Sequence, residues 1–90
     1  MICRIYDVQG ATLDQYDQVN ALEGGSEKPD GVHVHIAGKT DGGIRVIEVW
    51  DSAEHIDRYM EGFLGQALEE AGVPEPTVTE FEVHNLDWTD

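Results

Sequence analysis

Two alternating segments joined by a glycine-rich turn constrain the fold of this chain more than any other feature. The first, GVHVHIAG at 31–38, places β-branched residues and histidines at alternate positions, and IRVIEVW at 44–50 continues the pattern. Period-two alternation is typical of strands that bury one face. The KTDGG between them carries the Asp-Gly signal of a tight hairpin turn. We therefore predict an antiparallel hairpin in the middle of the chain.

The segment before the hairpin reads as a strand followed by a helix. Residues 2–9 are rich in β-favouring types and end at Gly10. Thr12 opens the helix, with Gln15 three positions later as its capping-box partner. The glycine pair at 24–25 is expected to end this helix.

The segment after the hairpin reads as a second helix and a last strand. Asp51 or Ser52 caps a long apolar stripe at helical spacing that continues to residue 71. Gly62 and Gly65 lie inside the stripe, so we expect the helix to kink or split there. Alternation at 77–86 predicts the final strand.

The resulting β-α-β-β-α-β order predicts an α+β, ferredoxin-like fold: a four-stranded antiparallel sheet with two helices on one face. Residues 1–86 form the predicted single domain and 87–90 a short acidic tail. A 90-residue chain buries only about 60–65% of the surface that its unfolded form exposes, so a partner subunit would help to stabilise it. We therefore expect a homodimer.

Alternation divides the strand residues into two sets, and we expect the more apolar set to face the helices. That set is Val32, Val34, Ile36, Ile47, Val49, Phe81 and Val83. The open face would then carry His33, His35, Glu48, Trp50 and His84, together with Tyr6 and Arg4. Such a mixture of apolar and titratable groups suggests a surface that meets a partner.

The charge of the chain limits its partners. Nineteen acidic residues against five basic ones give a formal net charge of −14. Nucleic acids and anionic membrane surfaces would be repelled. No apolar run approaches the length of about 18 residues that a membrane span needs. The start of the chain does not read as a signal peptide, so we expect a cytoplasmic protein. Cys3 is the sole cysteine and reads as a small core residue.

The sequence resembles the dimeric α/β-barrel superfamily that includes the antibiotic-biosynthesis monooxygenase (ABM) domains. The resemblance is carried by IEVWDS, where Glu48, Trp50 and the capping Ser52 lead into an amphipathic helix, and by the preceding HIAGKTDGG hairpin. In that family two subunits close a barrel with their open sheet faces. Characterised members oxygenate polycyclic aromatic substrates without metal or flavin. Others degrade haem, isomerise lactones or have no known reaction.

The resemblance implies that His33, His35, Glu48, Trp50 and His84 look into the barrel or its cavity. It implies a cofactor-independent oxygenase acting on an aromatic or polyketide-type small molecule, with no metal or organic cofactor. The sequence matches no proven catalytic set of the family residue by residue.

Three chemical interpretations of these residues remain open. In the first, His35 moves a proton with Glu48 as its orienting partner and His33 as a further catalytic candidate. Trp50, Tyr6 and His84 would then contact the substrate.

In the second, His33, His35 and His84 bind a metal ion, because imidazoles spaced two residues apart on one strand face can converge on one ion. In the third, the histidines hydrogen-bond carboxylates at a subunit interface, and the protein binds a small ligand without catalysis.

Overall fold

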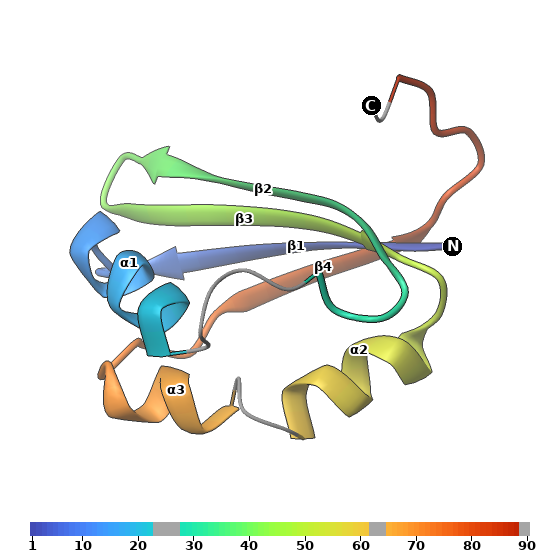
Figure 1. The fold of residues 1–90 in the computed structure, drawn as a ribbon. Helices are drawn as coiled ribbons and strands as arrows, with labels where there is room; N and C mark the ends of the chain where they lie inside the picture. The colour runs from blue at the N-terminus through green and yellow to red at the C-terminus, as the bar shows by residue number, and fades with distance from the viewer. Residues whose placement is uncertain (23–27, 62–64, 89–90) are drawn as a thin grey trace.

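The computed structural model describes residues 1–22, 28–61 and 65–88, which build a four-stranded antiparallel sheet with the helices on one face (Figure 1). The elements in chain order are β1 Ile2–Gln9, α1 Leu13–Leu22, β2 Val32–Thr40, β3 Gly43–Trp50, α2 Ala53–Tyr59, α3 Gly65–Glu70 and β4 Thr77–Glu82. The strand order β2-β3-β1-β4 places β1 and β3 in the centre. The predicted ferredoxin-like fold is confirmed, with its second helical segment divided into α2 and α3.

β2 and β3 form the predicted hairpin, which ends with Thr40 opposite Gly43. Gly42 in the turn has φ +83°, a left-handed conformation that glycine adopts without steric cost. Gly43 lies so close to β1 that a side chain there would overlap the carbonyl group of Val8. The two glycines therefore have different roles: one reverses the chain, and the other lets two strands approach.

A β-bulge near the start of β2 interrupts the alternation. Val32 pairs with Trp50, but Val34 already pairs with Val49, so β2 carries an extra residue between these two pairs. Val32 packs with Trp50 in the core beneath the helices, whereas Val34 shares the opposite face with Val49. The prediction that Val32, Val34 and Ile36 share one face is therefore wrong.

The helices cover the sheet face that we predicted to be open. Beneath them lie alternate residues of the two central strands: Tyr6, Val8, Ile44, Val46, Glu48 and Trp50. On the other face Ile36 and Phe81 are 54% and 51% exposed. The prediction failed because the strand residues that face one side of the sheet and those that face the other are both rich in apolar types. Alternation separates these two sets of strand residues but does not indicate which set the helices cover.

Both predicted helix starts are confirmed. Thr12 and Gln15 exchange backbone-to-side-chain hydrogen bonds of 3.0 and 3.1 Å, as a capping box requires. Ser52 caps α2 by accepting the backbone N–H of His55. The predicted helix end at 24–25 and the predicted kink or split at Gly62 lie outside the described residues, whereas Gly65 is the first residue of α3. Within the described ranges no helix is both long enough and apolar enough to span a membrane.

β4 ends at Glu82 rather than at residue 86. The N–H of Val83 still donates to the carbonyl group of Met1 at 2.9 Å. Beyond this bond the chain leaves the sheet and rises on the side opposite the helices (Figure 1). His84 and Trp88 on this segment are exposed, Trp88 to 93%.

Candidate functional site

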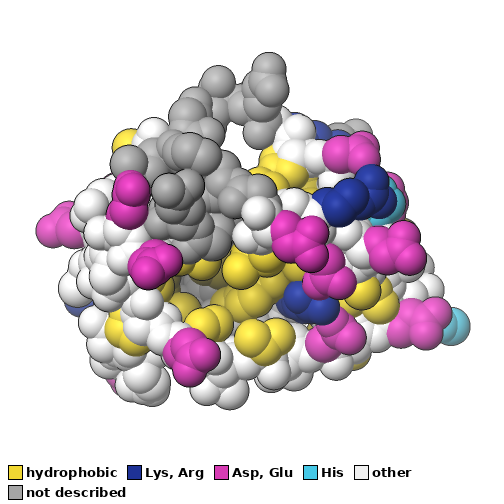
Figure 2. Space-filling model, turned by 90° about the horizontal axis from the view of Figure 1, so that it is seen from below, with side chains coloured by type: hydrophobic (Ala, Val, Ile, Leu, Met, Phe, Trp, Pro, Cys, Tyr) yellow, Lys and Arg dark blue, Asp and Glu magenta, His cyan; other side chains and the backbone are white. Residues whose placement is uncertain are grey.

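A cavity of about 280 Å³ lies between the sheet and the helices. Most of its wall is apolar and comes from all three helices and both central strands, including Val8, Val19, Ile44, Val46, Ile56 and Leu68. Figure 2, which views the helix side, shows hydrophobic side chains at the base of a hollow and acidic side chains around it. A largely apolar cavity with a few polar groups is the usual form of a small-ligand site.

Three polar side chains that line the cavity form a hydrogen-bonded chain, here called the relay: Tyr16, His35 and Glu48. The Tyr16 hydroxyl lies 2.7 Å from Nε2 of His35. Nδ1 of His35 lies 2.8 Å from Oε2 of Glu48. The indole Nε1 of Trp50 donates to the other oxygen of Glu48 at 3.2 Å. The relay thus joins α1, β2 and β3 and is anchored on a buried tryptophan.

The direction of these hydrogen bonds follows from their acceptors. A carboxylate only accepts, so the His35 proton lies on Nδ1 and is donated to Glu48. In the neutral imidazole Nε2 of His35 carries the lone pair, and the Tyr16 hydroxyl donates to it. In this protonation state the relay is oriented, with Tyr16 as the donor at one end and the Glu48 carboxylate as the acceptor at the other.

The local structure explains why Glu48 can be buried. Glu48 is only 8% exposed, although an unpaired carboxylate would be costly to remove from water. His35 is its direct cross-strand neighbour in the β2–β3 register. Trp50, two residues along β3 and on the same face, is 1% exposed and supplies the second hydrogen bond. Both carboxylate oxygens are therefore satisfied by side chains that the sheet register places beside them.

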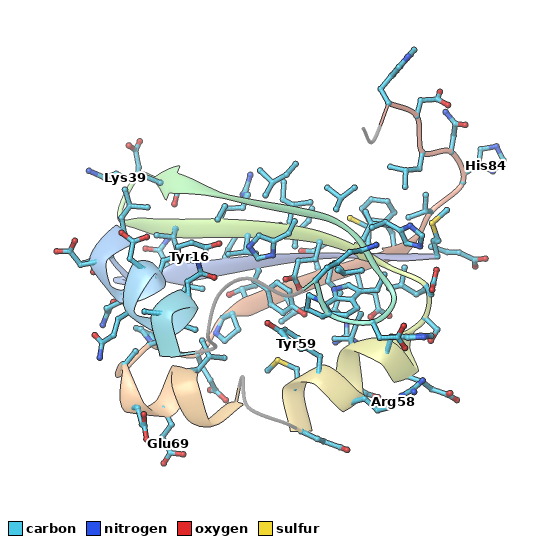
Figure 3. All side chains as sticks on the ribbon, in the orientation of Figure 1. Tyr16, Lys39, Arg58, Tyr59, Glu69 and His84 are labelled. Atoms are coloured by element: carbon cyan, nitrogen blue, oxygen red, sulfur yellow. The ribbon has the colours of Figure 1, made fainter. Side chains whose placement is uncertain are left out.

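Two further tyrosines line the cavity. Burial raises the pKa of the Tyr6 phenol above its ordinary value, so this residue keeps its proton and can donate a hydrogen bond near neutral pH. The Tyr59 ring lies 5.3 Å from the Trp50 ring, centroid to centroid, which gives α2 an aromatic contact with β3. Figure 3 shows Tyr16 and Tyr59 in the space between the helices and the sheet.

The predicted site residues divide into two groups. His35, Glu48 and Tyr6 line the cavity, and Trp50 supports it from the core. His33 instead lies 2.5 Å from Asp51 through Nε2, and this hydrogen bond lowers the pKa of the Asp51 carboxyl. His84 lies on the exposed segment after β4 and does not line the cavity (Figure 3).

The three histidines considered as a metal site are therefore not brought together within the chain. Among residues 1–22, 28–61 and 65–88, no group of three or more His, Cys, Asp or Glu side chains could hold a metal ion.

Sequence reasoning did not identify Tyr16 as a site residue. Tyr16 belongs to the apolar helical stripe of the first helix, where an aromatic residue reads as core. Its ring does pack on the cluster of Val8, Ala11 and Ile44. Only its hydroxyl, which reaches His35 from 19 residues away in sequence, gives it a polar role.

The fold and the cavity define a ferredoxin-like α+β protein with a partly open cavity between its sheet and helices. The solved structures that it resembles are ABM proteins. One from Chloroflexus aurantiacus has a TM-score of 0.71 and 16% identity, with 100% of both chains covered. One from Deinococcus radiodurans has a TM-score of 0.70 and 14% identity, with 97% and 96% covered.

SnoaB from Streptomyces nogalater, a cofactor-independent oxygenase, has a TM-score of 0.59 and 17% identity, with 94% of this chain and 92% of SnoaB covered. The sequence matches no protein-family model and no curated protein. The chain thus has the ABM fold.

Proposed function

We propose that this protein is a cofactor-independent oxygenase of an uncharged, fused-ring aromatic or polyketide-type molecule. The observation that carries the proposal is the oriented relay of Tyr16, His35 and Glu48 on the wall of an apolar cavity. Likeness of fold to a cofactor-independent oxygenase supports the same chemistry.

The cavity supports a compact, apolar substrate. Its volume of about 280 Å³ is near the lower end of the range of roughly 300–1,000 Å³ that is usual for ligand pockets. Its walls are mainly aliphatic and aromatic. The net charge of −14 and the acidic groups around the hollow would repel a molecule that is already anionic. The substrate therefore enters uncharged and ionises inside.

The proposed reaction begins when a proton leaves the substrate for the relay, with His35 as the base and Glu48 holding the imidazolium that forms. The electron-rich anion then reacts with dioxygen. At a methylene carbon the overall conversion is R₂CH₂ + O₂ → R₂C=O + H₂O. The substrate supplies all the electrons in this balance, so no external reductant is needed. Tyr6 and the apolar wall position the ring system and exclude water.

A homodimer is part of the proposal. The open sheet face of this small chain carries Ile36 and Phe81, both about half exposed. A second copy placed against that face would bury these side chains. The cavity lies on the opposite face, between sheet and helices, so dimerisation would leave it accessible.

A non-catalytic binding protein is the alternative function, because the cavity alone would suffice for it. Ligand binding can be followed through Trp50, whose ring contacts Tyr59 on the cavity wall. Trp88, which is 93% exposed, would add an unrelated signal, so the measurement uses a Trp88→Phe background. Fluorescence titration with polycyclic phenols and their reduced, methylene-containing forms identifies the ligands that bind.

Oxygen consumption with the ligands that bind then separates the two functions. We expect the wild-type protein to consume dioxygen. In His35→Gln the rate of oxygen consumption should fall at least tenfold. His84→Gln, an exposed histidine outside the cavity, is the matched control and should keep the full rate. Ligand binding without oxygen consumption by any bound compound would establish the binding protein instead.

A further inference from the structure

The relay leaves no ring nitrogen of His35 facing the substrate. Nδ1 lies 2.8 Å from Glu48, and Nε2 lies 2.7 Å from the Tyr16 hydroxyl, from which it accepts when the imidazole is neutral. A substrate could reach Nε2 only by displacing Tyr16. The Tyr16 oxygen, in contrast, can accept a proton while it releases its own, because a hydroxyl group both donates and accepts.

From this geometry we propose that Tyr16 is the residue that takes the proton from the substrate, and that His35 receives the proton of Tyr16. This inference rests on the proposed function and deepens it. It assigns a catalytic residue and a substrate class: uncharged phenols or enols whose acidic O–H, or whose activated C–H, can meet the Tyr16 oxygen.

The proton transfer is balanced within the site. The substrate O–H or C–H bond breaks, and its hydrogen bonds to Oη of Tyr16 as the proton of Tyr16 moves to Nε2 of His35. The electron pair of the broken bond stays on the substrate. Tyr16 ends unchanged, and the site holds a substrate anion and an imidazolium whose Nδ1–H remains on the Glu48 carboxylate.

The other tyrosines of the cavity have different environments. Burial raises the pKa of Tyr6, so that residue suits donation to the new anion and not proton removal. Tyr59, on α2, packs its ring against the Trp50 ring. Tyr16 is the tyrosine for which a hydrogen bond to a histidine ring is established, and that bond provides the path for its proton.

The test uses 1-naphthol, an aromatic phenol that is uncharged near neutral pH and whose anion absorbs at longer wavelength. The bound probe is titrated with pH under nitrogen, so that no oxygenation occurs. We expect the wild-type protein to lower the apparent pKa of the probe by at least one unit, which is a tenfold increase in the ratio of ionised to neutral probe. Tyr16→Phe should remove this shift while still binding the probe. Gln18→Ala, an exposed change on the same helix, should leave the shift intact.

Each outcome bears on the assignment. His35→Gln should also remove the shift, because glutamine cannot take up the proton. A shift that survives in Tyr16→Phe and is lost in His35→Gln would make His35 the direct acceptor and overturn the role of Tyr16. Failure of the wild-type protein to bind or ionise the probe would overturn it as well. A Tyr16-dependent shift without oxygen consumption would instead refute only the oxygenase proposal.

Discussion

Replacement of Glu48 by alanine or glutamine separates its structural role from its role in the relay. Alanine leaves the indole N–H of Trp50, a residue that is 1% exposed, without its acceptor, and it removes the hydrogen bond to His35. An unsatisfied buried donor costs about 1–3 kcal/mol, and a lost hydrogen bond to a charged group adds about 1 kcal/mol at the half-exposed His35. We therefore expect Glu48→Ala to lower the free energy of unfolding by about 3 kcal/mol.

Glutamine keeps the shape and an oxygen that can still accept from Trp50. Its amide NH₂ must then face Nδ1 of His35, so the imidazole proton moves to Nε2 and points at the Tyr16 oxygen. The relay is reversed, and Nε2 can no longer accept a proton from Tyr16. We expect Glu48→Gln to change the free energy of unfolding by no more than about 1 kcal/mol, because the buried donor of Trp50 stays satisfied. The ability to ionise a bound phenol should nevertheless be lost.

Urea denaturation followed by circular dichroism measures the change in the free energy of unfolding in both variants. ¹⁵N NMR of the His35 ring identifies its tautomer directly. Glu80→Gln is the control, since Glu80 forms an exposed ion pair with Arg4 and its loss should cost little. A Glu48→Gln protein that keeps its Nδ1–H tautomer and still ionises the probe would refute the oriented relay. A Glu48→Ala protein as stable as the wild type would refute the structural role.

Three further perturbations have defined outcomes. Gly31→Ala should destabilise the fold by about 1–3 kcal/mol in urea denaturation, because Gly31 has φ +87° and a Cβ there would overlap the His55 ring; wild-type stability would contradict this. His33 lowers the pKa of Asp51, so the stability from this pair is present above the unfolded pKa of about 4 and is lost as pH falls through the lower folded value. His33→Ala should flatten the acid limb of a stability–pH curve, and an unchanged limb would disprove the linkage. Phe81→Glu should give monomers in sedimentation at moderate salt, and a persistent dimer would exclude the open face as its interface.

The features that the sequence predicted well depend on residues close together in the chain. The hairpin depends on the Asp-Gly-Gly turn, and the helix starts depend on Thr12 with Gln15 and on Ser52. Each involves contacts over three or four residues, so local chemistry determines it. The order of strands and helices could be predicted from these local features, and the ferredoxin-like topology could be predicted from that order.

The features that it did not predict depend on how distant elements meet. The bulge between Val32 and Val34 shifts the register of β2, and no local signal marks it. Which sheet face the helices cover depends on the connections and not on alternation, so His35 and Glu48 were assigned to the wrong side. The pairing of Tyr16 with His35 exists only after α1 has packed on the sheet. A helical tyrosine in an apolar stripe carries no sign of such a partner.

The charge of the chain gives a physical reason for keeping the proton inside the site. A net charge of −14 makes the creation of one more negative charge unfavourable if the proton departs to solvent. Transfer through Tyr16 to His35 instead forms an imidazolium within the same relay as the substrate anion, so the net charge of the site does not change. In a cavity with mainly apolar walls this pairing is stronger than it would be in water. An acceptor and its countercharge in the cavity wall therefore lower the cost of ionising an uncharged substrate in so acidic a protein, and the relay lies in that wall.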